Sequence, residues 1–182
     1  MITSHAKESF DRIFRQAARA RLVIEAGGVC EIRPLTAPAS GEAGLAGTHS
    51  VAVLTISSLS FRLLVALHFG DDAATRSYFA GALQTRPHTD AFMEVANLCC
   101  GAMNQALVEY FPDLGMSTPY VLTNGSLAHW RELRPQLAAF YAMTIDASVR
   151  LAATVCVCAN APIDFVAHGT PVEETSGELE LF

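Results

Sequence analysis

The sequence predicts one α+β domain in which helices pack on one face of a mostly antiparallel sheet. Two segments rich in β-branched and apolar residues, Ser50–Phe69 and Leu137–Ala159, each contain a central turn and are typical of strand hairpins. Two other segments, Ser4–Leu22 and Asp90–Glu109, place apolar residues at helical spacing. Because the elements occur as helix, strand, hairpin, two helices and hairpin, a layer of helices on an antiparallel sheet is the expected arrangement.

Length and composition favour a single folded unit. The chain has 182 residues, of which 51% are hydrophobic and 16% are charged, against roughly 25% charged in an average soluble protein. This composition predicts a large core, a self-association surface, or both. We expect one domain over residues 1–166, followed by an acidic, mobile tail over residues 167–182.

Several classes of protein are disfavoured. The long apolar stretch Val51–Phe69 contains Arg62 and His68, so no transmembrane helix is predicted. The N-terminus becomes amphipathic at once and offers no signal-peptide core, so we expect a cytoplasmic protein. The net charge is −6 and the densest basic cluster is the arginines between Arg12 and Arg21. Nucleic acid is therefore not an expected partner.

The five cysteines contain no C-x-x-C pair, which favours buried free thiols and no metal site. Cys156 and Cys158 alternate in a strand-like run and would point the same way, so a metal role is conceivable there. No matching His or Cys pair accompanies them.

After the first helix we expect a strand over Leu22–Leu35, bent at Gly27-Gly28. A loop rich in Pro and Gly follows over Pro34–Gly47. Ser57-Ser58 is the expected turn of the first hairpin, and Asp72 caps a short helix through Leu83.

The second half contains the long helix, which Pro112 and Gly115 end. A turn-rich stretch then holds one short strand at Tyr120–Leu122. The final hairpin comprises strands Leu137–Ile145 and Val149–Ala159, joined at Asp146–Ser148.

The long helix carries the clearest signal of function. At 100° per residue, its polar residues fall within a sector of about 100°: Asp90, Glu94, Asn97, Gly101, Asn104 and Gln105. Almost every other residue of the helix is apolar, Leu98 and the Cys99-Cys100 pair included, so the helix should be buried on most sides and exposed along this strip.

Two interpretations of this strip are open. Any surface helix has a solvated polar face, and pattern alone favours that reading. However, Asn is a poor residue for a helix interior, and glycine costs about 1 kcal/mol there relative to alanine. Gly101 also removes the side chain that would keep a partner's backbone away, although it could equally reflect helix packing.

The run Asp90-x-x-x-Glu94-x-x-Asn97 continues into Gly101-Ala-Met-Asn104 and is followed by Gly115-Met-Ser-Thr-Pro119. It resembles the signature of the CheC/CheX/FliY family of chemotaxis phosphatases. The match covers about thirty residues closely and the remaining chain in element order.

The resemblance implies hydrolysis of the phospho-aspartate of a CheY-type response-regulator receiver domain. Asn97 would hold the attacking water and Glu94 would pair with a cationic side chain of the receiver. Asp90, Gly101 and Asn104 would serve docking. Asp90 is also expected to supply the cap or the first turn of the helix, with capping its favoured role. No cofactor of its own is implied, because the receiver brings its own Mg²⁺. Pro119 is expected to shape the turn after the helix.

Some members of this family carry a second copy of the motif on their first helix. Aligning Phe10 with Phe92 places Arg12 and Arg15 where Glu94 and Asn97 stand, so a second site is not expected. The resemblance is therefore to the single-site CheX-like branch, whose members are homodimers.

Three alternatives remain open. The same fold serves as a non-catalytic scaffold among flagellar switch components, so a receiver-binding module is the main alternative. A small-molecule hydrolase using His or Cys is a second, although no motif surrounds His68, His88 or His129. The C-terminal Glu178–Phe182 loosely resembles peptides that bind the bacterial sliding clamp, but an acidic tail or an added edge strand is favoured.

Overall fold

The computed structural model describes residues 1–38, 45, 49–80 and 87–168. In chain order the elements are α1 (Ser4–Arg21), β1 (Cys30–Leu35), β2 (Ser50–Ser57), β3 (Phe61–Phe69), α2 (Ala73–Ala80), α3 (His88–Val108), β4 (Gly115–Met116), β5 (Tyr120–Thr123), the 3-10 helix η1 (Asn124–Leu133), β6 (Leu137–Ile145) and β7 (Val149–Ala159). This is the predicted α+β class.

The strands form one sheet in the order β1-β6-β7-β3-β2, and β4 and β5 both pair with the outer edge of β2. Every strand pair in it is antiparallel, as predicted. Both hairpins are confirmed, and the second turns at Asp146 and Ala147, whose φ angles are +48° and +59°. A tight two-strand turn requires this left-handed backbone.

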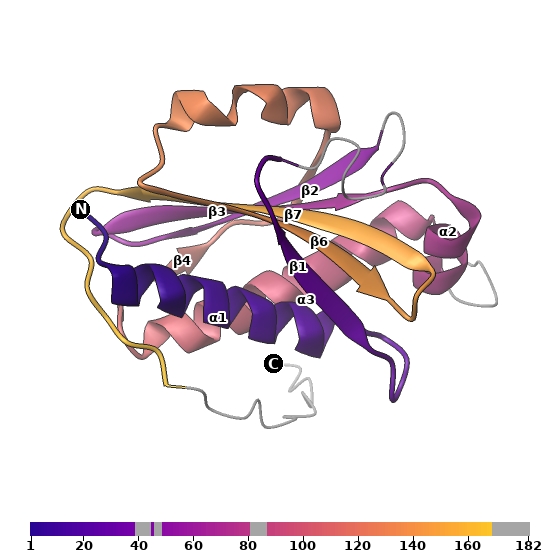
Figure 1. The fold of residues 1–182 in the computed structure, drawn as a ribbon, viewed down its shortest axis with the longest axis horizontal. Coiled ribbons are helices and arrows are strands. Elements are labelled where there is room, and N and C mark those ends of the chain that lie inside the picture. Colours follow the sequence, from indigo (N-terminus) through magenta and orange to yellow (C-terminus); the bar gives the residue numbers. More distant parts are fainter. Residues whose placement is uncertain (39–44, 46–48, 81–86, 169–182) are drawn as a thin grey trace, which may run out of the picture.

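The three α-helices cover one face of the sheet, and α1 and α3 lie side by side beneath it (Figure 1). Aromatic side chains join the layers: the Phe69 and Phe92 rings stack with centroids 4.0 Å apart, and Phe14 stacks on Tyr141 at 4.5 Å. The apolar residues whose helical spacing predicted both helices include the residues that make these core contacts.

The opposite face is covered by η1, which the sequence pattern did not predict (Figure 1). Leu127 of this helix packs on Val51, Val53 and Ala66, and Trp130 meets the ring of Phe140 edge to face. Short 3-10 helices depend on such tertiary contacts, so local sequence carries little signal of them.

Three further expectations have different outcomes. The strand expected from Leu22 begins only at Cys30, because Leu22 continues the end of α1 and Gly27 turns the chain with φ +81°. Asp72 caps α2 as expected, accepting a hydrogen bond from the Thr75 N–H. The described part of α2 ends at Ala80, and residues up to Leu83 lie outside the described residues, as does most of the expected loop Pro34–Gly47.

The C-terminal segment packs on the helical layer through His168. Ala167 is buried, its N–H donates to Ser9 Oγ, and its carbonyl accepts from Arg12 Nη1 at 2.7 Å. The His168 N–H donates to the Tyr110 hydroxyl. The remaining residues of the expected tail, 169–182, lie outside the described part of the chain.

The element order contains an internal twofold relationship. The unit α1-β1-β2-β3 is matched by α3-β5-β6-β7, and exchanging the two units leaves the strand order unchanged. The central strands β3 and β7 pair with each other, and each unit contributes one long helix to the same face. Helices α1 and α3 therefore occupy equivalent places in the fold.

Candidate functional site

The polar strip of α3 is exposed as the helical projection predicted. The buried residues of this helix are Ala91, Phe92, Ala96, Cys99, Cys100, Met103 and Leu107. Asp90, Glu94 and Gln105 are exposed, and Asn97, Gly101 and Asn104 are half-buried. One helix therefore presents all five candidate site residues in a row along one side.

Glu94 and Asn97 are one turn apart, so their Cβ atoms are about 5–6 Å from each other. Glu94 stands in solvent while the flank of Asn97 is covered. The exposed Glu94 carboxylate provides a charged docking group. The half-buried Asn97 carboxamide beside it can both donate and accept hydrogen bonds.

Asp90 does not cap the helix, which corrects that expectation. The N-cap is Pro87, which has no side chain able to accept a hydrogen bond, and the Asp90 N–H donates to the Pro87 carbonyl. The fixed φ of proline starts the helix without a side-chain cap. Asp90 lies in the first turn, where its carboxylate is stabilised by the positive end of the helix dipole.

The environment of Gly101 distinguishes its two readings. A Cβ atom built there would meet nothing within 4 Å, so packing inside the described part of the chain does not require glycine. Close approach of another molecule is the reading that retains a physical reason for this residue.

Asn104 follows one turn later and is held differently from Asn97. Its Oδ1 atom is buried and has no hydrogen-bond partner among the described residues. An unsatisfied buried polar atom costs about 1–3 kcal/mol. Docking through Asn104 would therefore have to use its amide nitrogen or a rearranged side chain.

Leu98 was expected on the buried side of α3, but its side chain is 55% exposed. It lies four residues after Glu94 and three before Gly101, so it borders the polar strip. Its projected angle, at the margin of the polar sector, was the signal available in the sequence. A large apolar side chain in this position gives the strip an apolar contact point.

The Gly115–Pro119 segment is attached to the edge of the sheet. Strand β4 pairs with β2, and Ser117 bonds Thr55 through its backbone N–H and its hydroxyl. Pro119 is half-buried in the connection to β5. Met116 pairs with Ile56 and Tyr120 with Val53 of the same strand, so the chain runs on in one direction and Pro119 lies in an extended connection, not in the expected turn.

Cys99, Cys100 and His68 do not form a nucleophilic site. Cys99 and Cys100 are fully buried, and burial raises the pKa of the Cys100 thiol to about 12. A thiol with so high a pKa is a poor nucleophile. His68 is buried against His49 and Thr154 on the opposite face of the sheet.

Cys156 is buried and Cys158 is half-buried, and burial raises the pKa of Cys156 to about 12. Within residues 1–38, 45, 49–80 and 87–168, no group of three or more His, Cys, Asp or Glu side chains is arranged to hold a metal ion. None of the helices in these ranges is long and apolar enough to cross a membrane.

The fold is that of CheX and CheC-like proteins. The CheX structure from Vibrio vulnificus is 16% identical, with a TM-score of 0.57, and the match covers 82% of this chain and 99% of that one. A chain of the CheX-CheY-BeF3-Mg complex from Borrelia burgdorferi is 12% identical, with a TM-score of 0.52, and the match covers 82% of this chain and 96% of that one. FliY from Thermotoga maritima is 13% identical over 85% and 91%, with a TM-score of 0.52.

No protein-family model matches the sequence, and the curated protein sequences contain no match to it. At these levels of identity the structural likeness establishes the fold alone. Evidence about activity comes from the residues of the α3 strip.

Proposed function

We propose that the protein is a phosphatase of a phosphorylated CheY-type receiver domain, with Asn97 positioning the attacking water and Glu94 docking the receiver. The observation that carries this proposal is the α3 strip. An exposed Glu94 and a half-buried Asn97 stand one turn apart, and the following turn carries a glycine with open space at its Cβ position.

The chemistry requires positioning more than new reactive groups. The receiver contributes the acyl phosphate and the Mg²⁺ that neutralises charge on the transferring phosphoryl group. The Asn97 carboxamide would accept a hydrogen bond from one water proton and hold the water in line with the phosphorus.

Docking would use the charged and apolar margins of the same strip. Glu94 would pair with a cationic side chain of the receiver, and Asp90, one turn earlier, adds a second carboxylate. Leu98 would pack on an apolar surface of the receiver, and Gly101 would let the receiver backbone approach the helix.

The alternative is a non-catalytic receiver-binding or scaffold module of a chemotaxis, flagellar or other two-component pathway. The exposed Leu98 favours binding whether or not a water is held, and the fold is shared with FliY as well as with CheX. Homodimerisation, implied by the sequence resemblance, belongs to this proposal too and is tested by sedimentation over a range of concentrations.

The deciding experiment follows loss of phosphate from a CheY-type receiver of the same cell, loaded with a small phosphodonor in the presence of Mg²⁺. The native chain is compared with Asn97→Ala, Glu94→Ala and the control Glu109→Ala, an exposed residue at the end of the same helix and outside the strip. The proposal expects the native chain to accelerate phosphate loss. Asn97→Ala should abolish this acceleration, Glu94→Ala should reduce it by weakening the affinity for the receiver, and Glu109→Ala should retain it. Binding of the phosphorylated receiver without acceleration would instead support the scaffold.

A further inference from the structure

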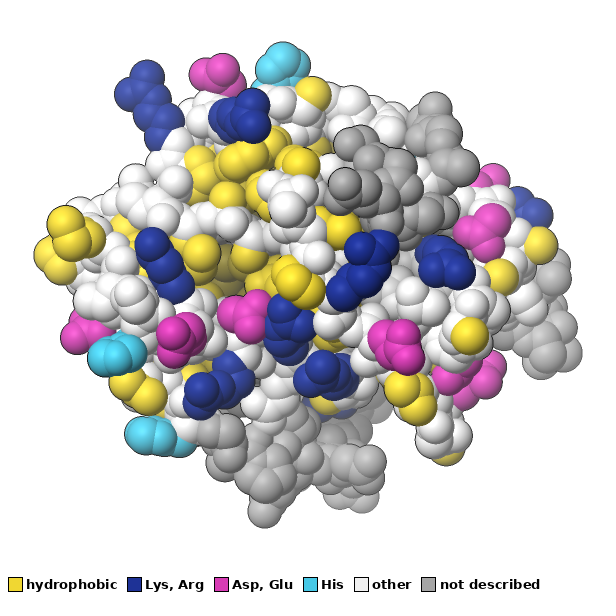
Figure 2. All heavy atoms as spheres, viewed as in Figure 1, with side chains coloured by type: hydrophobic (Ala, Val, Ile, Leu, Met, Phe, Trp, Pro, Cys, Tyr) yellow, Lys and Arg dark blue, Asp and Glu magenta, His cyan; other side chains and the backbone are white. Residues whose placement is uncertain are grey.

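A groove on the helical side of the molecule lies apart from the α3 strip. It runs between α1 and the first half of β6, with a volume of about 610 Å³. Its floor is apolar, formed by Phe10, Leu137, Ala139, Tyr141 and Val155. Figure 2 shows a hollow lined by hydrophobic side chains at this place, with Lys, Arg and acidic side chains around it.

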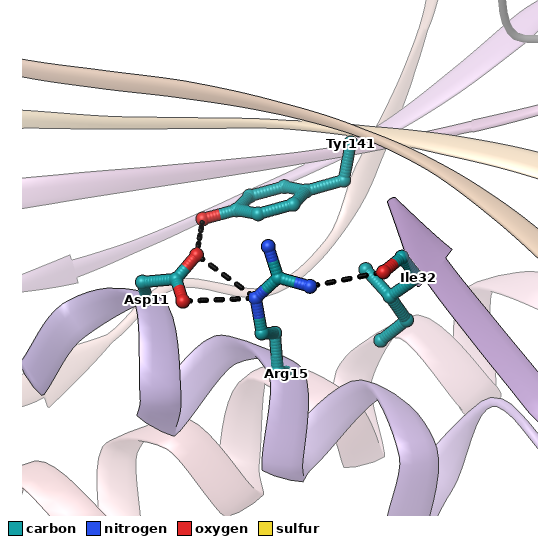
Figure 3. Close-up of polar contacts among 4 residues, drawn as sticks. All are labelled: Asp11, Arg15, Ile32 and Tyr141. Carbon is teal, nitrogen blue, oxygen red and sulfur yellow. Dashed lines mark hydrogen bonds and ion pairs between the residues drawn. The ribbon is translucent and has the colours of Figure 1, made fainter. Parts of the chain in front are cut away.

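The wall of the groove is basic although the chain as a whole carries −6. Lys7, Arg12, Arg15 and Arg19 line it, against two carboxylates, Glu8 and Asp11. Asp11 is already engaged, because it pairs with Arg15 at 2.8 Å and accepts a hydrogen bond from the Tyr141 hydroxyl (Figure 3). The wall therefore retains an excess of positive charge.

Two of these guanidinium groups are held by neutral acceptors. Arg15 Nη1 donates to the Ile32 carbonyl at 3.0 Å and Arg12 Nη1 to the Ala167 carbonyl. The bond to Ala167 fixes the Arg12 guanidinium without neutralising it, whereas Arg15 is also paired with Asp11. Among the described residues, no salt bridge joins Lys7, Arg12 or Arg19 to a carboxylate, and Lys7 and Arg19 are exposed at the rim.

The sheet has an open edge beside this floor. Strand β1 pairs with β6 only from Phe140 to Ile145. Residues Leu137–Ala139 pair with β7 on their inner side, and no described residue pairs with their outer side. An open edge next to an apolar floor favours addition of an extended segment whose alternate side chains enter the groove.

The chain itself contains a segment with matching chemistry. Residues 173–182 contain four glutamates and alternate acidic and apolar residues in Glu178-Leu179-Glu180-Leu181. The described chain ends at His168, next to Ala167, which is bonded to the groove-lining Arg12. The 14 residues that follow span about 46 Å when extended, and α1 with its 18 residues is about 27 Å long.

We propose that residues 173–182 bind in the α1 groove of the same chain, as an extended segment along the open edge of β6. Leu179 and Leu181 face the apolar floor, and the glutamates face the cations of α1. The occupant is intramolecular because the described chain ends one residue after Ala167, which bonds the groove-lining Arg12, and this tether raises the effective concentration of the segment to the millimolar range. This inference is independent of the proposed phosphatase activity, whose residues lie on α3.

The test is hydrogen–deuterium exchange of the full-length chain, read on residues 173–182 and compared with a free peptide of the same sequence. Slowing by about tenfold or more is expected in the native chain. The double variant Lys7→Glu/Arg19→Glu should abolish it, because both side chains are exposed at the rim. Arg150→Glu, an exposed arginine outside the groove lining, is the matched control and should retain it.

Charge exchange guards against a merely unfolded variant. Adding Glu178→Lys and Glu180→Lys to the Lys7→Glu/Arg19→Glu chain should restore the slow exchange. Exchange at the free-peptide rate in the native chain would overturn the proposal. Slow exchange that disappears on dilution would also overturn it, since a second copy would then supply the segment.

Discussion

His49 Nε2 lies 3.1 Å from His68 Nδ1, and the other ring nitrogen of His68 lies 3.2 Å from Thr154 Oγ1, in a buried chain of polar groups on the η1 side of the sheet. Burial, and then the neighbouring His49, lower the pKa of His68 to about 3. Such a pair tolerates neutral imidazoles and resists protonation.

We therefore expect His68 to make the folded protein less stable as the pH falls. Its folded pKa lies below the unfolded value of about 6.5, so the unfolded chain binds more protons between these values and stability is lost as pH falls below 6.5. From pH 7.5 to pH 5 this loss is on the order of 2 kcal/mol. His68→Gln should remove it, measured as free energy of unfolding in urea at both pH values. Equal losses of stability in the native chain and in His68→Gln would contradict the role given to His68.

Two glycines with open surroundings should respond to alanine in opposite ways. Gly101→Ala should raise the free energy of unfolding by about 1 kcal/mol, because a Cβ there meets nothing within 4 Å and alanine favours helix. Gly27→Ala is the control: its Cβ also meets nothing, but φ is +81°, so strain should lower stability. Destabilisation by Gly101→Ala in urea titrations would mean that α3 packs more tightly than described.

Leu98 should contribute to affinity for the receiver. Leu98→Ala removes an exposed apolar side chain from the margin of the strip, and we expect binding of a phosphorylated receiver to weaken about five- to tenfold. Leu59→Ala is the matched control, since Leu59 is 87% exposed in the β2–β3 turn and is not part of the α3 strip. Calorimetric titration that finds both variants unchanged would place Leu98 outside the interface.

Tyr141→Phe should weaken the attachment of α1 to the sheet. The Tyr141 hydroxyl donates a hydrogen bond of 2.7 Å to Asp11 Oδ1 (Figure 3). The Tyr141 ring stacks on Phe14. Phenylalanine keeps the stacking and removes the hydrogen bond, so a loss of about 1–2 kcal/mol in the free energy of unfolding is expected. Tyr120→Phe, at a half-exposed edge strand, should leave stability unchanged; a similar loss there would attribute the effect to hydroxyl removal in general.

The order and type of the long elements were predictable because each is defined by local periodicity. The helix ending in Arg21 and the strands Leu137–Ile145 and Val149–Ala159 have the predicted limits to within a residue. The strip from Asp90 to Gln105 followed from the same periodicity, since a helix buried on most sides leaves one exposed row. The prediction that Asp90 caps this helix was wrong, because the helix begins earlier, with Pro87 at the N-cap position.

By itself the sequence determined the α+β class, the hairpins and the side of α3 that faces solvent, because these depend on residues within one or two turns of each other. The tertiary structure decided what distant residues do together: that η1 covers the second face, that Leu98 stays exposed, and that Ala167 is held by Arg12. It also decided that β1 stops short of Ala139 and leaves a basic groove beside the open edge. Such features come from packing between segments far apart in the chain, and no local pattern encodes that packing.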